Sequence, residues 1–168
     1  MQHGGMKTLL ILYHSRTGGT AQMARAALRG AMAEAQCRTR LLEAPHASAD
    51  DVLAADGYIF AAPENLASLS GPMKDFFDRT YYPLLGRIEG RAYASLICAG
   101  SDGEGAARQI ARIVTGWRLK QVAEPLVIHT HAQTPETILA AKIIPPEALN
   151  ACASLGEALA AGLAMGVF

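Results

Sequence analysis

Residues 8–20 read TLLILYHSRTGGT, an apolar run followed directly by a loop of hydroxyl residues and glycine. The apolar run, Thr8 to Tyr13, has the length and composition of a buried strand. After the loop, Thr20 to Gln36 repeats small apolar side chains at helical spacing. A strand that enters a helix through such a loop is typical of α/β folds, in which helices cover a largely parallel sheet.

The rest of the chain continues this alternation of strands and helices. Four more runs are expected to be strands: Cys37 to Leu42, Tyr58 to Ala62, Ala92 to Cys98 and Pro125 to Thr130. The first of these carries charged residues between apolar ones, which favours an edge of the sheet. The expected later helices are one opened by Ser70-Gly71-Pro72, one from Ala106 to Gly116, and a last region that starts at Thr134-Pro135, is broken at Pro145-Pro146 and continues to Leu163.

Five strands, four crossover helices and a final helix predict one domain over residues 1–168. The expected architecture is a doubly wound, five-stranded parallel sheet of order 2-1-3-4-5. In that order, the loops after the first and third strands border a crevice at the carboxyl edge of the sheet, where such folds bind ligands. Residues 1–5 are expected to be a disordered leader, although Met6 serves equally well as the start of the folded part.

Composition excludes several classes of protein. Of the 168 residues, 51% are hydrophobic and 18% charged, which indicates a well-filled core. Fifteen Lys and Arg against fifteen Asp and Glu leave no net charge to attract nucleic acid or an anionic membrane. Cys37, Cys98 and Cys152 form no zinc-binding pattern, so reduced, buried thiols and no metal site are expected. The N-terminal apolar stretch is too short for a signal sequence or a membrane span, which favours a cytoplasmic protein.

The loop between the first strand and the first helix has the features of an anion site. Its hydroxyl and glycine residues, which can surround a phosphate at the positive end of the helix, are Ser15, Thr17, Gly18, Gly19 and Thr20. Hydrogen bonds to a charged group contribute roughly 1.5 to 3 kcal/mol each, so four or five of them hold a phosphate monoester without a lysine. The loop lacks the Gly-Lys-Ser/Thr of a nucleotide triphosphatase, the GxGxxG of a dinucleotide site, the acidic residues of a response-regulator receiver and the cysteine of a low-molecular-weight tyrosine phosphatase. A monophosphate is therefore the expected ligand.

Three segments together resemble the flavin-binding loops of flavodoxin-like proteins. Ser15-Arg16-Thr17-Gly18-Gly19-Thr20 resembles the FMN-phosphate loop of flavodoxins. Ala62-Pro63-Glu64-Asn65 and the helix start from Gly71 to Arg79 are similar to segments of NADPH-dependent FMN reductases, and Gly100 to Gly105 resembles the glycine-rich third loop of that group. From about Met6 to its final helix, the chain is identified as a member of the flavodoxin-like superfamily, similar to NADPH-dependent FMN reductases and WrbA-like flavoproteins.

The resemblance implies FMN as the cofactor. The residues that it places around FMN are Ser15, Arg16, Thr17, Gly18, Gly19 and Thr20 at the phosphate, Pro63, Glu64, Asn65 and Leu66 along the ring, and Ala99, Gly100, Ser101, Asp102 and Gly103 at the polar edge of the ring. Relatives often carry an aromatic residue where this chain has Asn65, which implies either weaker stacking or a flavin face left open for a second planar substrate. The third loop lacks the insertion that supports tetramers in WrbA-like relatives. The resemblance therefore leaves the oligomeric state open, with a homodimer as one alternative.

The activity that the resemblance implies is that of an FMN-dependent NAD(P)H oxidoreductase. Hydride would pass from NADPH or NADH to FMN and on to a quinone or similar small acceptor, with no obligatory catalytic side chain. The alternatives are a flavodoxin-type electron carrier, which the zero net charge disfavours, and a domain that kept the fold without the flavin. His129 and His131 are expected at the same sheet edge, either as proton donors or as solvated loop residues.

Overall fold

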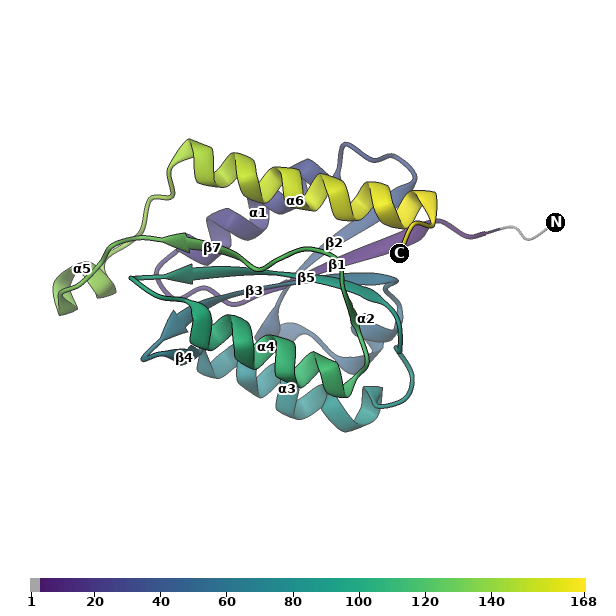
Figure 1. Cartoon of the computed structure of the whole chain (residues 1–168), viewed down its shortest axis with the longest axis horizontal. Coiled ribbons are helices and arrows are strands. Elements are labelled where there is room, and N and C mark those ends of the chain that lie inside the picture. Colours follow the sequence, from purple (N-terminus) through teal and green to yellow (C-terminus); the bar gives the residue numbers. More distant parts are fainter. Residues whose placement is uncertain (1–3) are drawn as a thin grey trace.

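The expected strands form one sheet in a computed structural model that describes residues 4–168 (Figure 1). The order is β2-β1-β3-β5, and β6 and β7 both pair with the far side of β5. Since β7 is the expected fifth strand, the predicted order is confirmed, with β2 at an edge. The parallel strands are β1 Lys7–Tyr13, β2 Cys37–Glu43, β3 Gly57–Asn65, β5 Ala92–Ala99, β6 Lys120–Gln121 and β7 Leu126–His129, and β4 Ser68–Leu69 is antiparallel to β3.

Most of the expected leader lies outside the described part of the chain, which begins at Gly4. Gly4 and Gly5 are exposed and belong to no helix or strand. Whether residues 1–5 form a leader stays a prediction.

Side chains alternate along the central strands and divide the core between the two faces of the sheet. On β1, Leu10 and Leu12 belong to one core cluster, while Leu9 and Ile11 belong to the other, and all four are fully buried. Phe60 of β3 is in register with Leu12 and joins the first cluster. Each such buried side chain contributes about 1.5 to 3 kcal/mol. Burial on both faces explains why these strands read as continuous apolar runs.

Within the described residues, α1 and α6 cover one face of the sheet, and α2, α3 and α4 cover the other (Figure 1). α5 lies beyond the carboxyl ends of the strands, away from both layers. The helices are α1 Gly19–Ala31, α2 Ala49–Leu53, α3 Gly71–Leu84, α4 Glu104–Gly116, α5 Pro135–Leu139 and α6 Pro146–Met165, with a short 3-10 helix, η1 Ala44–His46, before α2.

A close contact between α1 and α6 explains why both helices are rich in small residues. A Cβ at Gly30 would overlap the carbonyl oxygen of Ala153, and one at Gly156 would overlap that of Ala27, so the two backbones meet directly. Among the described residues, α6 is the one helix long and apolar enough to cross a membrane by length and composition alone, with mean hydropathy 1.3. Because core helices pass the same test and α6 packs along α1, this is weak evidence for a membrane span.

The expected end of the first helix at Gln36 is wrong, because α1 ends at Ala31. Beyond it, the backbone N–H of Glu34 bonds back to the Ala31 carbonyl in a tight turn. Cys37 already pairs with Lys7 at the start of β2, so residues 32–36 form the connection between α1 and β2.

Four elements had no residue range predicted from the sequence, namely η1, α2, β4 and β6, although α2 is one of the four expected crossover helices. α2 begins with a capping box, in which Ser48 and Asp51 each accept a hydrogen bond from the other's backbone N–H. β4 exists because β3 continues to Asn65 and folds back through Leu66 and Ala67. The capping box is visible in the sequence, whereas the turn contains no residue that usually marks one.

Candidate functional site

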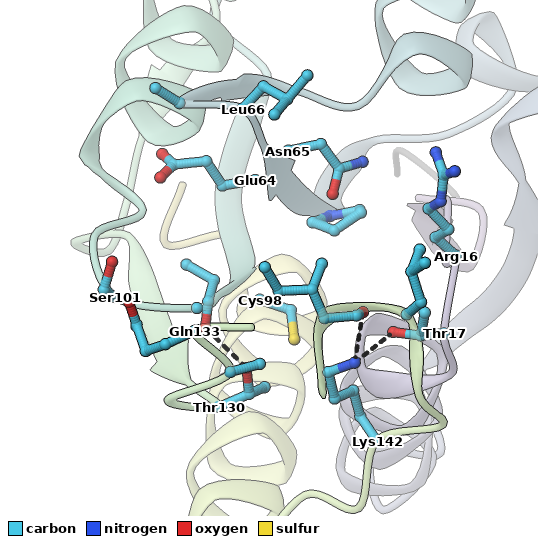
Figure 2. Close-up of a pocket in the computed structure, with 17 residues that line it drawn as sticks. Arg16, Thr17, Glu64, Asn65, Leu66, Cys98, Ser101, Thr130, Gln133 and Lys142 are labelled. Carbon is cyan, nitrogen blue, oxygen red and sulfur yellow. Dashed lines mark hydrogen bonds between the residues drawn. The ribbon is translucent and has the colours of Figure 1, made fainter. Parts of the chain in front are cut away.

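A cavity of about 460 Å³ opens at the carboxyl edge of the sheet, where the loops after β1, β3 and β5 meet (Figure 2). We name them the first loop (residues 14–20, which reaches into α1), the second loop (residues 63–67, the end of β3 and the turn to β4) and the third loop (residues 99–103, from the last residue of β5). The position is the crevice expected from the strand order, and the volume suits a small-molecule ligand.

The first loop turns the chain from β1 into α1 beside the cavity. Arg16 and Thr17 line the cavity, and Gly18 precedes the helix with φ 93°, a conformation that glycine favours. The Ser15 hydroxyl oxygen accepts hydrogen bonds from the N–H groups of Gly18 (3.2 Å) and Ala21 (3.1 Å). Ser15 therefore shapes the turn and caps the helix.

Several backbone N–H groups of the first loop have no protein acceptor. Those of Arg16, Thr17, Gly19 and Thr20 donate to no residue between 4 and 168. They lie at the N-terminus of α1, whose first turn holds no acidic residue. Free donors at the positive end of a helix attract an anion.

The hydroxyl of Thr20 adds a second sign of a missing partner. Thr20 is 1% exposed, and its Oγ1 has no oxygen or nitrogen as hydrogen-bond partner in the described chain; its neighbour is the Cys98 thiol, which is a weak partner. A buried hydroxyl without a partner costs about 1 to 3 kcal/mol. This atom and the free N–H groups fit a phosphate, and with it FMN, as the ligand of the first loop.

Gly19 has a packing role as well as a free N–H. A Cβ there would lie 2.7 Å from Cys98 Sγ and 3.4 Å from Lys142 Cβ, so its missing side chain lets other protein segments approach α1. Cys98 also lines the cavity. Burial raises the pKa of its thiol, against smaller opposing effects of the Thr20 hydroxyl and the Lys142 ammonium. The thiol therefore stays protonated at neutral pH, as expected for a core cysteine.

All the expected residues of the second loop line the cavity. They are Pro63, Glu64, Asn65 and Leu66, and Ala67 joins them. Leu66 and Ala67 form the turn with φ values of 51° and 61°, in the left-handed region that costs a residue with a side chain about 1 kcal/mol or more. Leu66 is fully exposed at the tip of the turn. Strain of this kind often accompanies a ligand site.

The Glu64 carboxylate is bound by α4. Its Oε1 accepts a hydrogen bond from the Gly103 N–H (2.9 Å), and its Oε2 accepts one from the Ala106 N–H (3.0 Å). Farther along α4, Gln109 Oε1 accepts from the Leu69 N–H (2.6 Å). Glu64 therefore holds the second loop against the third and stabilises the N-terminus of α4. The resemblance placed Glu64 along the flavin ring and did not predict these hydrogen bonds to α4.

The third loop is only partly a cavity wall. Ala99, Gly100 and Ser101 line the cavity as expected, but Asp102 and Gly103 do not. The side chain of Asp102 accepts a hydrogen bond from the first N–H of α4, and Gly103 precedes that helix with φ 99°. A Cβ at Gly103 would press into β7, so these two residues shape the start of α4, and their contact with FMN stays a prediction.

The remaining wall was not expected from the sequence. It is the strap, which we define as residues 130–144, between β7 and α6, and it includes α5. The sequence predicted a helix start at Thr134-Pro135, where α5 begins, but only the tertiary structure places the strap against the first loop. Its residues that line the cavity are Thr130, Ala132, Gln133, Ile138, Leu139 and Lys142.

Hydrogen bonds fix the end of the strap on the first loop and on α1. The Lys142 N–H donates to the Thr17 carbonyl (2.9 Å), and the Lys142 carbonyl accepts from Gln22 Nε2 (2.7 Å). The Ile144 N–H donates to Gln22 Oε1 (3.0 Å). Figure 2 shows the Lys142 side chain reaching Thr17 from below. By contrast, α5 buries none of its residues.

His14 joins the first loop to the start of α3. Its Nδ1 lies 2.9 Å from the Ser70 hydroxyl. Burial, helped by the charge of Arg16, lowers the pKa of His14, against the effect of Glu43. The neutral ring therefore predominates near pH 7.

The two histidines at the end of β7 and just beyond it stand apart from the cavity. His129 Nε2 lies 2.7 Å from the Asp102 carbonyl oxygen and is exposed, and neither His129 nor His131 lines the cavity. Thr130, between them, does. The geometry agrees with solvated loop residues better than with proton donors to a ligand.

Comparison with known proteins agrees with these features. The family model described as NADPH-dependent FMN reductase matches residues 43–134, more than half of the chain, including the second and third loops. A flavodoxin of Aquifex aeolicus is 35% identical over 60% of this chain and 54% of its own length. An NAD(P)H dehydrogenase (quinone) of Acidithiobacillus ferrooxidans is 32% identical over 45% of this chain and 48% of its own length. The chain thus spans about half the length of the curated relatives it matches.

Solved structures support the fold. The structure of a flavodoxin from the domain Archaea superposes with a TM-score of 0.74 at 18% identity, over 93% of this chain and 98% of the other. At this identity the likeness concerns the fold alone, and it confirms the flavodoxin-like architecture expected from the sequence.

Proposed function

Because the chain belongs to the NADPH-dependent FMN reductase family, we propose that it is an FMN-dependent oxidoreductase that transfers electrons from NADPH or NADH to a quinone or similar small acceptor. The observation that carries the proposal is the first loop. It combines free N–H groups, the unpartnered Thr20 hydroxyl and the positive end of α1 beside a cavity of about 460 Å³.

The three loops would bind different parts of the cofactor. The first loop would bind the phosphate through the N–H groups of Arg16, Thr17, Gly19 and Thr20. The second and third loops would enclose the ring between residues 63–66 and residues 99–101. FMN, when bound, supplies two-electron chemistry between a nicotinamide and an acceptor. The protein's own part is to bind and orient, so no side chain is assigned a proton transfer.

The composition of the cavity wall favours an enzyme over an electron carrier. None of the residues that line the cavity is aromatic, and Asn65 stands where an aromatic would cover the ring. An uncovered ring leaves room for a nicotinamide or a quinone. The zero net charge points the same way, because carriers depend on charged surfaces to steer them to partner proteins.

One observation favours a second candidate, a flavodoxin-type carrier. The relative from Aquifex aeolicus, at 35% identity, is named a flavodoxin. In that case the flavin would exchange electrons with partner proteins, and nicotinamides would not react with it.

Steady-state turnover distinguishes the two candidates. Purified protein loaded with FMN is mixed with NADPH or NADH, with and without a small benzoquinone, and the nicotinamide absorbance is followed. We expect oxidation of at least one nicotinamide that depends on both FMN and quinone. If neither nicotinamide is consumed while chemically reduced protein still passes electrons to a redox protein, the carrier replaces the enzyme.

Three further properties belong to the same proposal: a single domain over residues 1–168, a cytoplasmic location and a homodimer in solution. The three cysteines, Cys37, Cys98 and Cys152, are free and buried, in agreement with a reducing compartment. Light scattering of the purified chain tests the homodimer.

A further inference from the structure

Lys142 brings a cation onto the first loop from the far end of the chain. Its Nζ lies 3.3 Å from Thr17 Oγ1 (Figure 2). It also donates to the carbonyl oxygens of Ile138 (2.8 Å) and Ala140 (2.5 Å). These three oxygens account for the three protons of the ammonium group. The contact with Thr17 is the longest, so it is the one that a stronger acceptor would replace.

No carboxylate neutralises this cation. Across residues 4–168, neither Lys142 nor Arg16 forms an ion pair, although both line the cavity. The one carboxylate in the cavity wall, that of Glu64, is bound by the N-terminus of α4. The cavity therefore carries an excess of positive charge beside the free N–H groups of the first loop, which favours a dianion.

Hydrogen bonds hold both the backbone and the ammonium group of Lys142. Its N–H and carbonyl bond to Thr17 and Gln22, so the charge is held in place before a ligand arrives. The ammonium group, in turn, holds the end of α5 through Ile138 and Ala140. α5 buries no residue, and these two bonds join its end to the side chain of Lys142.

We propose that Lys142 binds the phosphate of FMN by charge and thereby couples phosphate binding to the ordering of the strap. The inference rests on the proposed function, in which FMN is the ligand of the first loop. Lys142 lies outside the residues that the family model matches, and the first-loop motif does not contain it. The phosphate takes the place of Thr17 Oγ1 as acceptor, and the bonds to α5 remain.

Binding of FMN and riboflavin by Lys142→Gln tests the proposal. Riboflavin has the same ring and no phosphate, so flavin fluorescence quenching with both ligands isolates the phosphate contribution. We expect Lys142→Gln to weaken FMN binding about tenfold, the low end for a hydrogen bond to a charged group, and to change riboflavin binding less than about twofold. Lys142→Arg keeps the charge and should keep most of the FMN affinity.

A matched control removes the same charge elsewhere. Lys120 lies in β6 beside Ala92, at the amino edge of the sheet, and is exposed. Lys120→Gln should leave the affinities for both flavins unchanged.

Hydrogen exchange gives a second readout. In the wild-type protein, FMN should slow amide exchange in residues 135–141, and riboflavin should not. In Lys142→Gln, the slowing by FMN should be lost at FMN concentrations that saturate both proteins.

Two results would overturn the inference, one by rejecting the role of Lys142 alone and the other by rejecting the phosphate site as well. Equal weakening of FMN and riboflavin by Lys142→Gln, or no weakening of either, would leave Lys142 as a structural tie of the strap. If the wild-type protein binds FMN no better than riboflavin, the phosphate assignment in the proposed function fails, and the role of Lys142 fails with it.

Discussion

The missing side chain at Gly19 decides how closely β5 and the strap approach the first loop. A Cβ there would meet the Cys98 sulfur at 2.7 Å inside the core, so Gly19→Ala should lower the free energy of unfolding by about 1 to 3 kcal/mol. Cys98→Ala removes the opposing atom. The double variant should therefore be more stable than the sum of the single effects predicts, with a coupling of about 1 kcal/mol in urea unfolding. Strict additivity would show that the two residues do not oppose each other.

At the same scale, His14 links stability to pH. Its pKa is lowered by burial and by Arg16, so the unfolded chain binds more protons than the folded chain as the pH falls below about 6.5. Stability should therefore rise with pH up to about 6.5 and stay level above it. The measurement is the urea midpoint across that range. In His14→Asn, the rise of stability with pH should be smaller. The exposed His46 is the control, and His46→Asn should keep the full rise. Equal slopes in the two variants would contradict the assignment of the pH dependence to His14.

At the scale of elements, one carboxylate holds the β3–β4 hairpin against α4. Glu64 accepts two hydrogen bonds from the N-terminus of α4, so Glu64→Ala should lower the free energy of unfolding by about 1 to 3 kcal/mol. Glu104→Gln is the matched control. Glu104 lies in the first turn of the same helix with its side chain exposed, and its loss should cost less than about 0.5 kcal/mol. Similar costs in urea unfolding would mean that only the helix dipole matters at this position.

The elements that were predicted correctly are those whose signals are local. The strands follow from burial on both faces, and the first loop follows from a motif of consecutive residues. The β3–β4 turn was missed because Leu66 and Ala67 adopt left-handed conformations without glycine or asparagine. The helix start of the strap at Thr134-Pro135 was predicted, but its place in the cavity wall was missed, because its contact joins Lys142 to Thr17, 125 residues earlier. Such pairings depend on the complete fold, and no single segment encodes them.

For the molecule as a whole, the sheet brings together segments that are distant in the chain. The first loop lies at the end of β1, the second at the end of β3, the third at the end of β5, and the strap after β7. A ligand that touches all four binds the folded state and not the unfolded chain. Its binding free energy therefore adds to the stability of the entire fold.

Thermal unfolding measures this gain without reference to activity. At an FMN concentration of 100 times Kd, the added stability is about 2.7 kcal/mol, which for a chain of this size raises the Tm by about 5 to 10 °C. Gly18→Val should abolish the rise, because it adds a side chain at the first loop. Gly86→Val is the matched control, since Gly86 also has a positive φ (76°, against 93° for Gly18) but lies between α3 and β5, at the opposite edge of the sheet. Both variants should lower the Tm without ligand, and only Gly86→Val should retain the FMN-dependent rise; a rise that persists in Gly18→Val would place the ligand away from the first loop.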